Sequence, residues 1–384
     1  MKVQFIIKKI QTTTLLLAIS SLMCMGFAVF MIHSAPSIYE ISSNEKYLQV
    51  DSLFKSLSHF SAKDMFQPEN LFCLSMSPIR LIYEKGVIWR SEDAVWEETF
   101  YDPIYTIDNE NEPKIENSEI SEGTKPVISL TMYPPKSFNG IDGVYINNED
   151  NKKYSLEELL VDKPDIKLKN TAKPQVLIIH THATESYNEL GLNYYDENNP
   201  FRSEDNNKNV IHIGDIAAQM LEKSGYTVVH DTTQHDNPNF TGSYTSSNKA
   251  IKAYLEKYPT IKVVLDIHRD TLITEKNIKY RPVVSIDGQQ SAQVMLLMGG
   301  GNSTYQNSHW KENMKFAVSI QKIAAKKYPN LMRPILLRNS RYNQQLSNGS
   351  LLVEIGTCGN SMREAELAAI YFTDALIEVL DDLK

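Results

Sequence analysis

The sequence is poor in cysteine, with three among its 384 residues. Cys24, Cys73 and Cys358 lack the paired spacing that is typical of a thiolate zinc site. Cys73 and Cys358 could pair in an oxidising compartment, but two cysteines are too few for a disulfide framework. We therefore expect both of them to be free thiols.

A surplus of positive charge is also missing. The 39 Lys and Arg residues are outnumbered by 47 Asp and Glu residues, which gives a net charge of −8. Because a polyanion is usually bound by a basic surface, this balance argues against a nucleic-acid partner. The sequence also has no G-x-S-x-G elbow, no P-loop and no G-x-G-x-x-G fingerprint. These absences argue against a nucleophilic serine hydrolase and against the common nucleotide-binding sites.

One long apolar run lies near the N-terminus. Thr13 to Ile32 carry no charge over 20 positions, the length that a helix needs to cross the hydrocarbon core of a membrane. Lys2, Lys8 and Lys9 precede this run, and their charge favours a cytoplasmic N-terminus. A cleavable signal peptide with a small-residue boundary near Ala35 is the alternative, but its apolar region would be shorter. We expect an uncleaved transmembrane anchor and an extracytoplasmic remainder.

Changes in composition divide the chain. Residues 1–12 are the expected cytoplasmic N-terminus, and residues 33–106 form an accessory region without an assigned role. Residues 107–126 are rich in acidic side chains and poor in large apolar ones, as in a solvated linker. A lead-in segment at 127–174 then brings the chain to the predicted catalytic domain, residues 175–384.

Strand-like and helix-like periodicities alternate within the predicted catalytic domain. This alternation predicts an α/β fold, a mostly parallel sheet with helices on both faces. Asp287 and Gly288 form a turn signal that favours a hairpin between two of the strands. The expected strands are 176–179, 226–230, 261–267, 281–286, 292–298, 334–337 and 351–355, and the expected long helices lie at about 305–327 and 362–379.

Side chains that commonly bind metals follow two of these strands. VLIIHTHATESY (176–187) places His180, His182 and Glu185 after an apolar run, and IKVVLDIHRD (261–270) contains His268 at its end. Sites in open parallel sheets lie beyond the carboxyl ends of the strands. Two histidines, a carboxylate and a water form a common catalytic zinc site. We expect His180 and His268 as ligands with Glu185 as the carboxylate, whereas His182 either replaces one of these or orients a ligand.

A lone carboxylate lies inside the apolar run SLLVEIG (350–356). An unpaired carboxylate is costly to bury, so Glu354 needs a role. The functional one is that of general base and then general acid, and the structural alternative is an ion pair with Arg269 or Arg338. Arg269 and Asp270 directly follow His268, and we assign them to substrate or supporting contacts.

Three stretches together resemble the stage II sporulation protein P family of endospore-forming bacteria. They are VLIIHTHATESY, GSYTSSNKAIKAYLEKYPTIKVVLDIHRD and NQQLSNGSLLVEIGTCGN, and the likeness runs from about Gly143 to the C-terminus. The resemblance implies a zinc-dependent N-acetylmuramoyl-L-alanine amidase, related in fold to cell-wall amidases, with a further endopeptidase activity on peptide cross-links. It also implies action at the sporulation septum, with stage II sporulation proteins D and M, during engulfment of the forespore.

The resemblance also implies roles for single residues. The family's zinc ligands correspond to His180, Glu185 and His268, and its catalytic glutamate corresponds to Glu354. Many wall amidases have the carboxylate ligand further along the chain, near the first helix. In this sequence that region offers Asp215, or Glu204 and Asp205.

The residues and the resemblance together predict a membrane-anchored zinc amidase that acts on peptidoglycan. One alternative is a protein with an amidase-like fold that binds peptidoglycan or septal partners without cutting. Another is a zinc carboxypeptidase that acts on the stem peptide itself.

Overall fold

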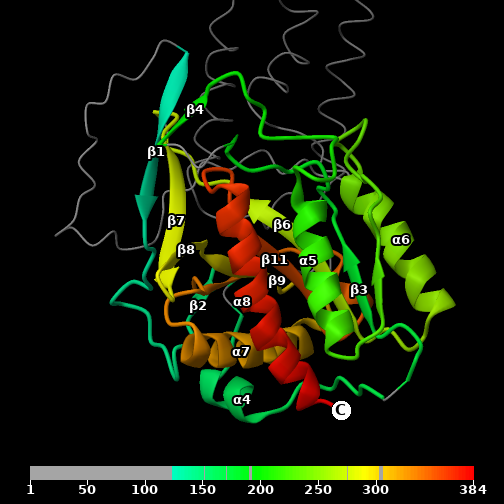
Figure 1. The fold of residues 1–384 in the computed structure, drawn as a ribbon. Helices are drawn as coiled ribbons and strands as arrows, with labels where there is room; N and C mark the ends of the chain where they lie inside the picture. Colours follow the sequence, from blue (N-terminus) through cyan, green and yellow to red (C-terminus); the bar gives the residue numbers. More distant parts are fainter. Residues whose placement is uncertain (1–122, 151, 170, 190–192, 275, 302–305) are drawn as a thin grey trace, which may run out of the picture. The chain divides into compact units, whose positions relative to one another are not determined.

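The computed structural model describes residues 123–384, apart from 151, 170, 190–192, 275 and 302–305 (Figure 1). The predicted anchor, the accessory region and most of the acidic linker therefore lie outside the described residues. Within the described ranges, no helix combines the length and apolar character needed to cross a membrane. The first strand, β1 (Thr124–Leu130), begins within the last residues of the predicted linker.

A seven-stranded sheet forms the centre of the fold, in the order β2-β10-β9-β11-β6-β3-β5. Neighbouring strands in it are parallel except for the pair β9–β11. The prediction of a mostly parallel α/β sheet is confirmed. The strands are β2 (Ile146–Asn148), β3 (Val176–Ile179), β5 (Val228–His230), β6 (Val263–Asp270), β9 (Val294–Gly299), β10 (Ile335–Arg338) and β11 (Ser350–Thr357).

Helices cover both faces of this sheet (Figure 1). Successive residues of β3 point to opposite faces, so Val176 and Ile178 join the larger core while Leu177 and Ile179 join a smaller one. The larger core lies under α5 (Val210–Lys223), α7 (Trp310–Lys327) and α8 (Met362–Asp381), and the smaller one lies under α6 (Ser243–Lys257). A short helix, α4 (Leu156–Val161), packs against α7.

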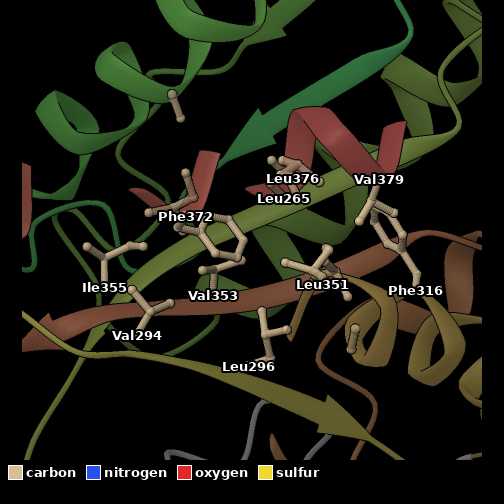
Figure 2. Close-up of a cluster of buried hydrophobic side chains, with 14 of the residues drawn as sticks. Leu265, Val294, Leu296, Phe316, Leu351, Val353, Ile355, Phe372, Leu376 and Val379 are labelled. Atoms are coloured by element: carbon tan, nitrogen blue, oxygen red, sulfur yellow. The ribbon is translucent and has the colours of Figure 1, made fainter. Parts of the chain in front are cut away.

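Large apolar side chains fill the space between the sheet and helices α7 and α8. Phe316 of α7 and Phe372 of α8 pack over Leu351 and Val353 of β11 (Figure 2). Each such side chain contributes roughly 1.5 to 3 kcal/mol when it is fully buried. Helix α8 begins with a capping box, in which Ser361 and Glu364 satisfy each other's backbone N–H groups. The core therefore holds β11, the strand that carries Glu354, in a fixed place.

A second, four-stranded sheet has the order β4-β1-β7-β8. Its remaining strands are β4 (Tyr194–Asp196), β7 (Lys279–Ile286) and β8 (Gln289–Ala292). The predicted hairpin is present, with Asp287 and Gly288 both at positive φ between β7 and β8. The single strand expected at 292–298 is split, because the chain leaves β8 and enters the central sheet as β9. Gln293 fills this crossing with hydrogen bonds to the backbone of Met132.

Candidate active site

The carboxyl ends of β3, β6 and β11 bring the candidate residues together. In the parallel register of β6 and β11, His268 and Glu354 are direct partners. Parallel pairing of β3 with β6 sets Ile179 beside Asp266, so the loop that follows β3 starts next to His268. The strand ends therefore place the VLIIHTHATESY loop, His268 and Glu354 at one edge of the sheet, where ligands bind in open α/β folds.

Three possible metal ligands meet in this loop region. The rings of His182 and His268 lie with centroids 5.3 Å apart, edge to face. Glu185 Oε2 is 3.4 Å from His268 Nδ1. All three side chains are buried. Two imidazoles and a carboxylate are a donor set that suits zinc.

Each histidine of this group is oriented by a neighbour on its far side. His268 Nε2 lies 2.9 Å from Asp266 Oδ1, a close ion pair whose geometry falls short of a hydrogen bond. His182 Nδ1 lies 3.3 Å from Ser243 Oγ. These contacts leave His268 Nδ1 directed at Glu185 and leave His182 Nε2 for a ligand. A carboxylate behind a ligating histidine is a common way to fix its tautomer and ring orientation.

Burial and charge set the protonation of the group. Burial lowers the pKa of His182 to about 3, so its ring is neutral. Burial acts against charge on His268 too, but Asp266 and Glu185 outweigh it and raise the pKa of His268 well above its usual value. Burial acts to raise the pKa of Glu185, and the charge of Arg269 with the contact to His268 reverses this and lowers it. A carboxylate and a neutral imidazole are the forms that bind metals, so Glu185 and His182 are in binding form, whereas His268 has to release a proton when a metal binds.

Glu354 has a buried carboxylate oxygen, Oε2, that lacks a hydrogen bond among the described residues. Burial, followed by the charge of Asp270, raises its pKa to about 8. The two arginines of the structural alternative contact other carboxylates, since Arg338 pairs with Glu149 and Arg269 lies by Glu185. A carboxyl group poised near neutral pH suits general acid–base work.

His180 has other contacts, although it directly follows β3. Its Nδ1 donates a hydrogen bond to the Ile267 carbonyl at 2.9 Å, and its Nε2 lies 2.9 Å from His230 Nε2. Burial, followed by the charge of His230, lowers the pKa of His180 to about 3. With its proton on Nδ1, the neutral ring can accept a hydrogen bond at Nε2 from His230, whose Nδ1 lies 3.1 Å from Asp215 Oδ1. Both nitrogens of His180 are engaged within the protein.

Helix α5 packs tightly against this second pair. A Cβ at Gly214 would lie 2.6 Å from the Nε2 atoms of both His180 and His230. Only glycine fits at such a close approach. Of the acidic residues that the sequence offered as alternative ligands, Asp215 contacts His230, and Glu204 and Asp205 are exposed.

Arg269 is buried and binds the protein backbone. Its guanidinium donates to the carbonyls of Ser186 and Phe201 and to Thr271 Oγ1, at 2.7 to 3.0 Å. Its backbone N–H donates to Glu185 Oε2 at 3.1 Å. The structure thus gives this side chain contacts that hold the loop of Glu185 against β6.

Among the described residues, no three His, Cys, Asp or Glu side chains already stand in the geometry of a metal-ligand set. The donor set at His182, Glu185 and His268 nevertheless fits zinc by its chemistry. It offers a neutral imidazole, an ionised carboxylate and a ring nitrogen that faces the carboxylate, and Asp266 supports it from behind.

Solved structures of cell-wall amidases are among those to which this chain is similar. An N-acetylmuramoyl-L-alanine amidase from Clostridium difficile 630 is 14% identical with a TM-score of 0.33, over 56% of this chain and 100% of that one. The CwlD amidase from Clostridioides difficile, solved with the GerS lipoprotein, is 16% identical with a TM-score of 0.34, over 54% of this chain and 98% of that one.

The sequence relationship is closer. A curated relative, Stage II sporulation protein P of Bacillus subtilis (strain 168), is 29% identical over 221 residues, which cover 55% of this chain. The match spans about half of that relative, 52% of its length. The family model described as Stage II sporulation protein P matches residues 105–377. The chain belongs to the Stage II sporulation protein P family.

The part of the chain that matches this family contains every residue of the site. It includes the loop with His182 and Glu185, and it extends past Glu354 into α8. Cys358 also lies in this range and is a buried free thiol, as predicted.

Some residues next to the site were not predicted from the sequence. For one of them, Asp266, the strand pattern was sufficient to predict its position. Asp266 lies two positions before His268 in an apolar strand, and strand alternation puts both side chains on the same face. Its two oxygens also accept hydrogen bonds from the backbone and the hydroxyl of Thr181. His230 ends a predicted strand, but nothing in the sequence pairs it with His180. Phe240, whose ring stacks on His182, and Arg202, which lies over Phe240, are in loops, where no periodicity reveals them.

Proposed function

We propose that this member of the Stage II sporulation protein P family is a zinc-dependent peptidoglycan amidase. The reaction is hydrolysis of the amide between N-acetylmuramic acid and the L-alanine of the stem peptide. The observation that carries the proposal is the meeting of His182, Glu185 and His268 beside Glu354, whose buried Oε2 has no hydrogen-bond partner among the described residues. The resemblance of the three site stretches to the family supports the choice of substrate.

In this proposal His182, Glu185 and His268 hold the zinc ion. Zinc, when bound, supplies a Lewis acid that polarises a carbonyl and makes a water more acidic. Asp266 lies 2.9 Å from His268 Nε2 and favours a proton there, which would leave Nδ1 to bind the ion. Arg269 keeps Glu185 in place through its backbone N–H, and Thr181 fixes Asp266.

Glu354 carries the proton in this mechanism. As a carboxylate it accepts a proton from the attacking water, and as an acid it donates that proton to the leaving amine nitrogen. Its pKa of about 8 without metal makes it a ready donor. A nearby positive charge favours the carboxylate, so the pKa falls in the zinc-loaded enzyme and the group can also act as a base.

The cellular setting belongs to the same proposal. The apolar run Thr13–Ile32 anchors the chain in a membrane, and the catalytic domain acts outside the cytoplasm at the sporulation septum. The resemblance supports stage II sporulation proteins D and M as partners, and a second cut at peptide cross-links.

The test is metal analysis and wall digestion with the purified full chain. We expect about one zinc ion per chain, and mass spectrometry should find stem peptides that begin with L-alanine. Loss of a single C-terminal residue from the stem peptide would instead identify a carboxypeptidase. Absence of any released fragment, with binding to sacculi intact, would identify a non-catalytic wall-binding protein.

A further inference from the structure

Arg202 lies at the edge of the candidate site, on the segment that pairs with the loop of Glu185. Arg202 and Glu185 form an isolated antiparallel bridge. On either side of it, Ser186 N donates to Phe201 O at 3.0 Å and Ser203 N donates to Thr184 O at 2.7 Å. The backbone of Arg202 is thus fixed to the segment that holds a proposed zinc ligand.

The side chain of Arg202 is held on one edge and one face. Its Nη1 donates to Asp236 Oδ2 at 3.0 Å and to Thr184 Oγ1 at 3.2 Å. Its guanidinium carbon lies 4.5 Å from the centre of the Phe240 ring. Phe240 in turn stacks on His182, with ring centroids 4.4 Å apart. This stack sets the plane of the guanidinium relative to the zinc-binding histidine.

The other edge of Arg202 is open. Its Nε and Nη2 donate to no described residue, and the side chain is 29% exposed. Arg269 and Arg333 differ, because their side chains are at most 2% exposed and lie within the protein. Arginine has five N–H donors in a rigid plane, so one paired edge leaves further donors for a second carboxylate. A cation that is fixed in place and partly open beside a reaction centre is suited to bind a charged group of the substrate.

We propose that Arg202 binds a carboxylate of the substrate's peptide portion and so determines specificity. This inference rests on the proposed function. The nearest carboxylate beyond the scissile amide is that of the second stem residue, which occurs as the free acid (isoglutamate) or as the carboxamide (isoglutamine). Only the acid can form a charge-assisted pair with the open edge of Arg202.

The experiment compares two disaccharide tetrapeptides that differ only in this acid or amide, with the detergent-solubilised full chain. We expect wild-type kcat/KM to be about tenfold higher for the acid, the size of one charge-assisted hydrogen bond. Arg202→Gln should lower kcat/KM for the acid about tenfold and leave the amide within about twofold, so that the preference disappears. Arg202→Lys should keep part of the preference, because it retains the charge without the planar fork.

Arg363→Gln is the matched control, since Arg363 is an exposed arginine on α8 paired with Glu366, and it should leave the preference unchanged. Equal kcat/KM for acid and amide in the wild type would overturn the inference, while the proposed function would stand. The same holds if Arg202→Gln slowed both substrates equally, because Arg202 would then only hold the loop in place. If the wild type cut neither fragment nor intact sacculi, the proposed function would fall, and this inference with it.

Discussion

Two histidine clusters lie at the ends of neighbouring strands, and their contacts differ. In the first, His180 and His230 face each other at 2.9 Å, and their outer nitrogens reach Ile267 O and Asp215. In the second, His182 and His268 meet Glu185 beside a carboxyl oxygen that has no hydrogen-bond partner among the described residues. Every ring nitrogen of the first cluster faces a group of the protein, as in a structural network, whereas the second cluster keeps groups for a ligand.

The largest expected effect comes from the carboxyl group of the second cluster. Glu354→Gln should lower kcat for release of stem peptide by roughly 100-fold to 10,000-fold, because it removes the proton carrier. Zinc content should stay at the wild-type level, since Glu354 is not a proposed ligand. Mass spectrometry of digested sacculi and metal analysis of the same sample check both statements. An active Glu354→Gln enzyme would remove Glu354 from the mechanism.

Separate substitutions in the two clusters should have opposite consequences for zinc binding. His182→Ala should abolish zinc binding, and because its ring is buried against Phe240 it should also lower the free energy of unfolding of the metal-free protein. His180→Ala should remove the partner of His230 and create a cavity. We expect it to lower the free energy of unfolding by about 2 to 4 kcal/mol. We expect His180→Ala to retain zinc at a temperature where it is folded. Urea unfolding with metal analysis separates the two, and zinc loss in His180→Ala alone would reverse the assignment.

The pH dependence of stability should reveal the buried acid. The folded-state pKa of Glu354 is raised to about 8 from a usual value of 4.5. Between these values the folded protein binds more protons than the unfolded chain, so stability falls as pH rises through this window. In the metal-free Glu354→Gln variant, the fall in the free energy of unfolding over this pH window should be smaller than in the wild type by a few kcal/mol. Identical pH profiles for wild type and variant, measured by urea unfolding from pH 4.5 to 8.5, would contradict the raised pKa.

The smallest expected effect concerns the packing of the first cluster. Gly214→Ala adds a methyl group 2.6 Å from both Nε2 atoms, which forces the rings apart. We expect a loss of about 1 to 3 kcal/mol, as for other overpacked sites. Zinc content should be unchanged. Gly225, where a Cβ would meet nothing within 4 Å, offers a control position for the added methyl group, although its φ of 86° adds strain.

The sequence predicted the elements that carry the site better than it predicted the partners within the site. Apolar runs bounded by polar residues located β3, β6 and β11, and turn chemistry at Asp287 and Gly288 located the hairpin. Strand β8 was not predicted, because three of its four residues are polar (Gln289, Gln290 and Ser291) and only Ala292 fell within the strand expected at 292–298. Its place is set by its pairing with β7, a tertiary contact.

The choice between His180 and His182 shows the same limit. Both follow β3, and spacing alone does not tell which ring turns toward His268. Their contacts depend on Ile267, Ser243 and Phe240, which are distant in sequence. Asp266 was within reach of sequence reasoning, because alternation along β6 sets it on the face of His268.

The most direct test of the account is the position of the metal in crystals of the zinc-loaded protein, from anomalous scattering at the zinc edge. We predict one peak about 2.0 to 2.2 Å from nitrogens of His182 and His268 and from a carboxylate oxygen of Glu185. A peak between His180 and His230, with His182 unliganded, would contradict it.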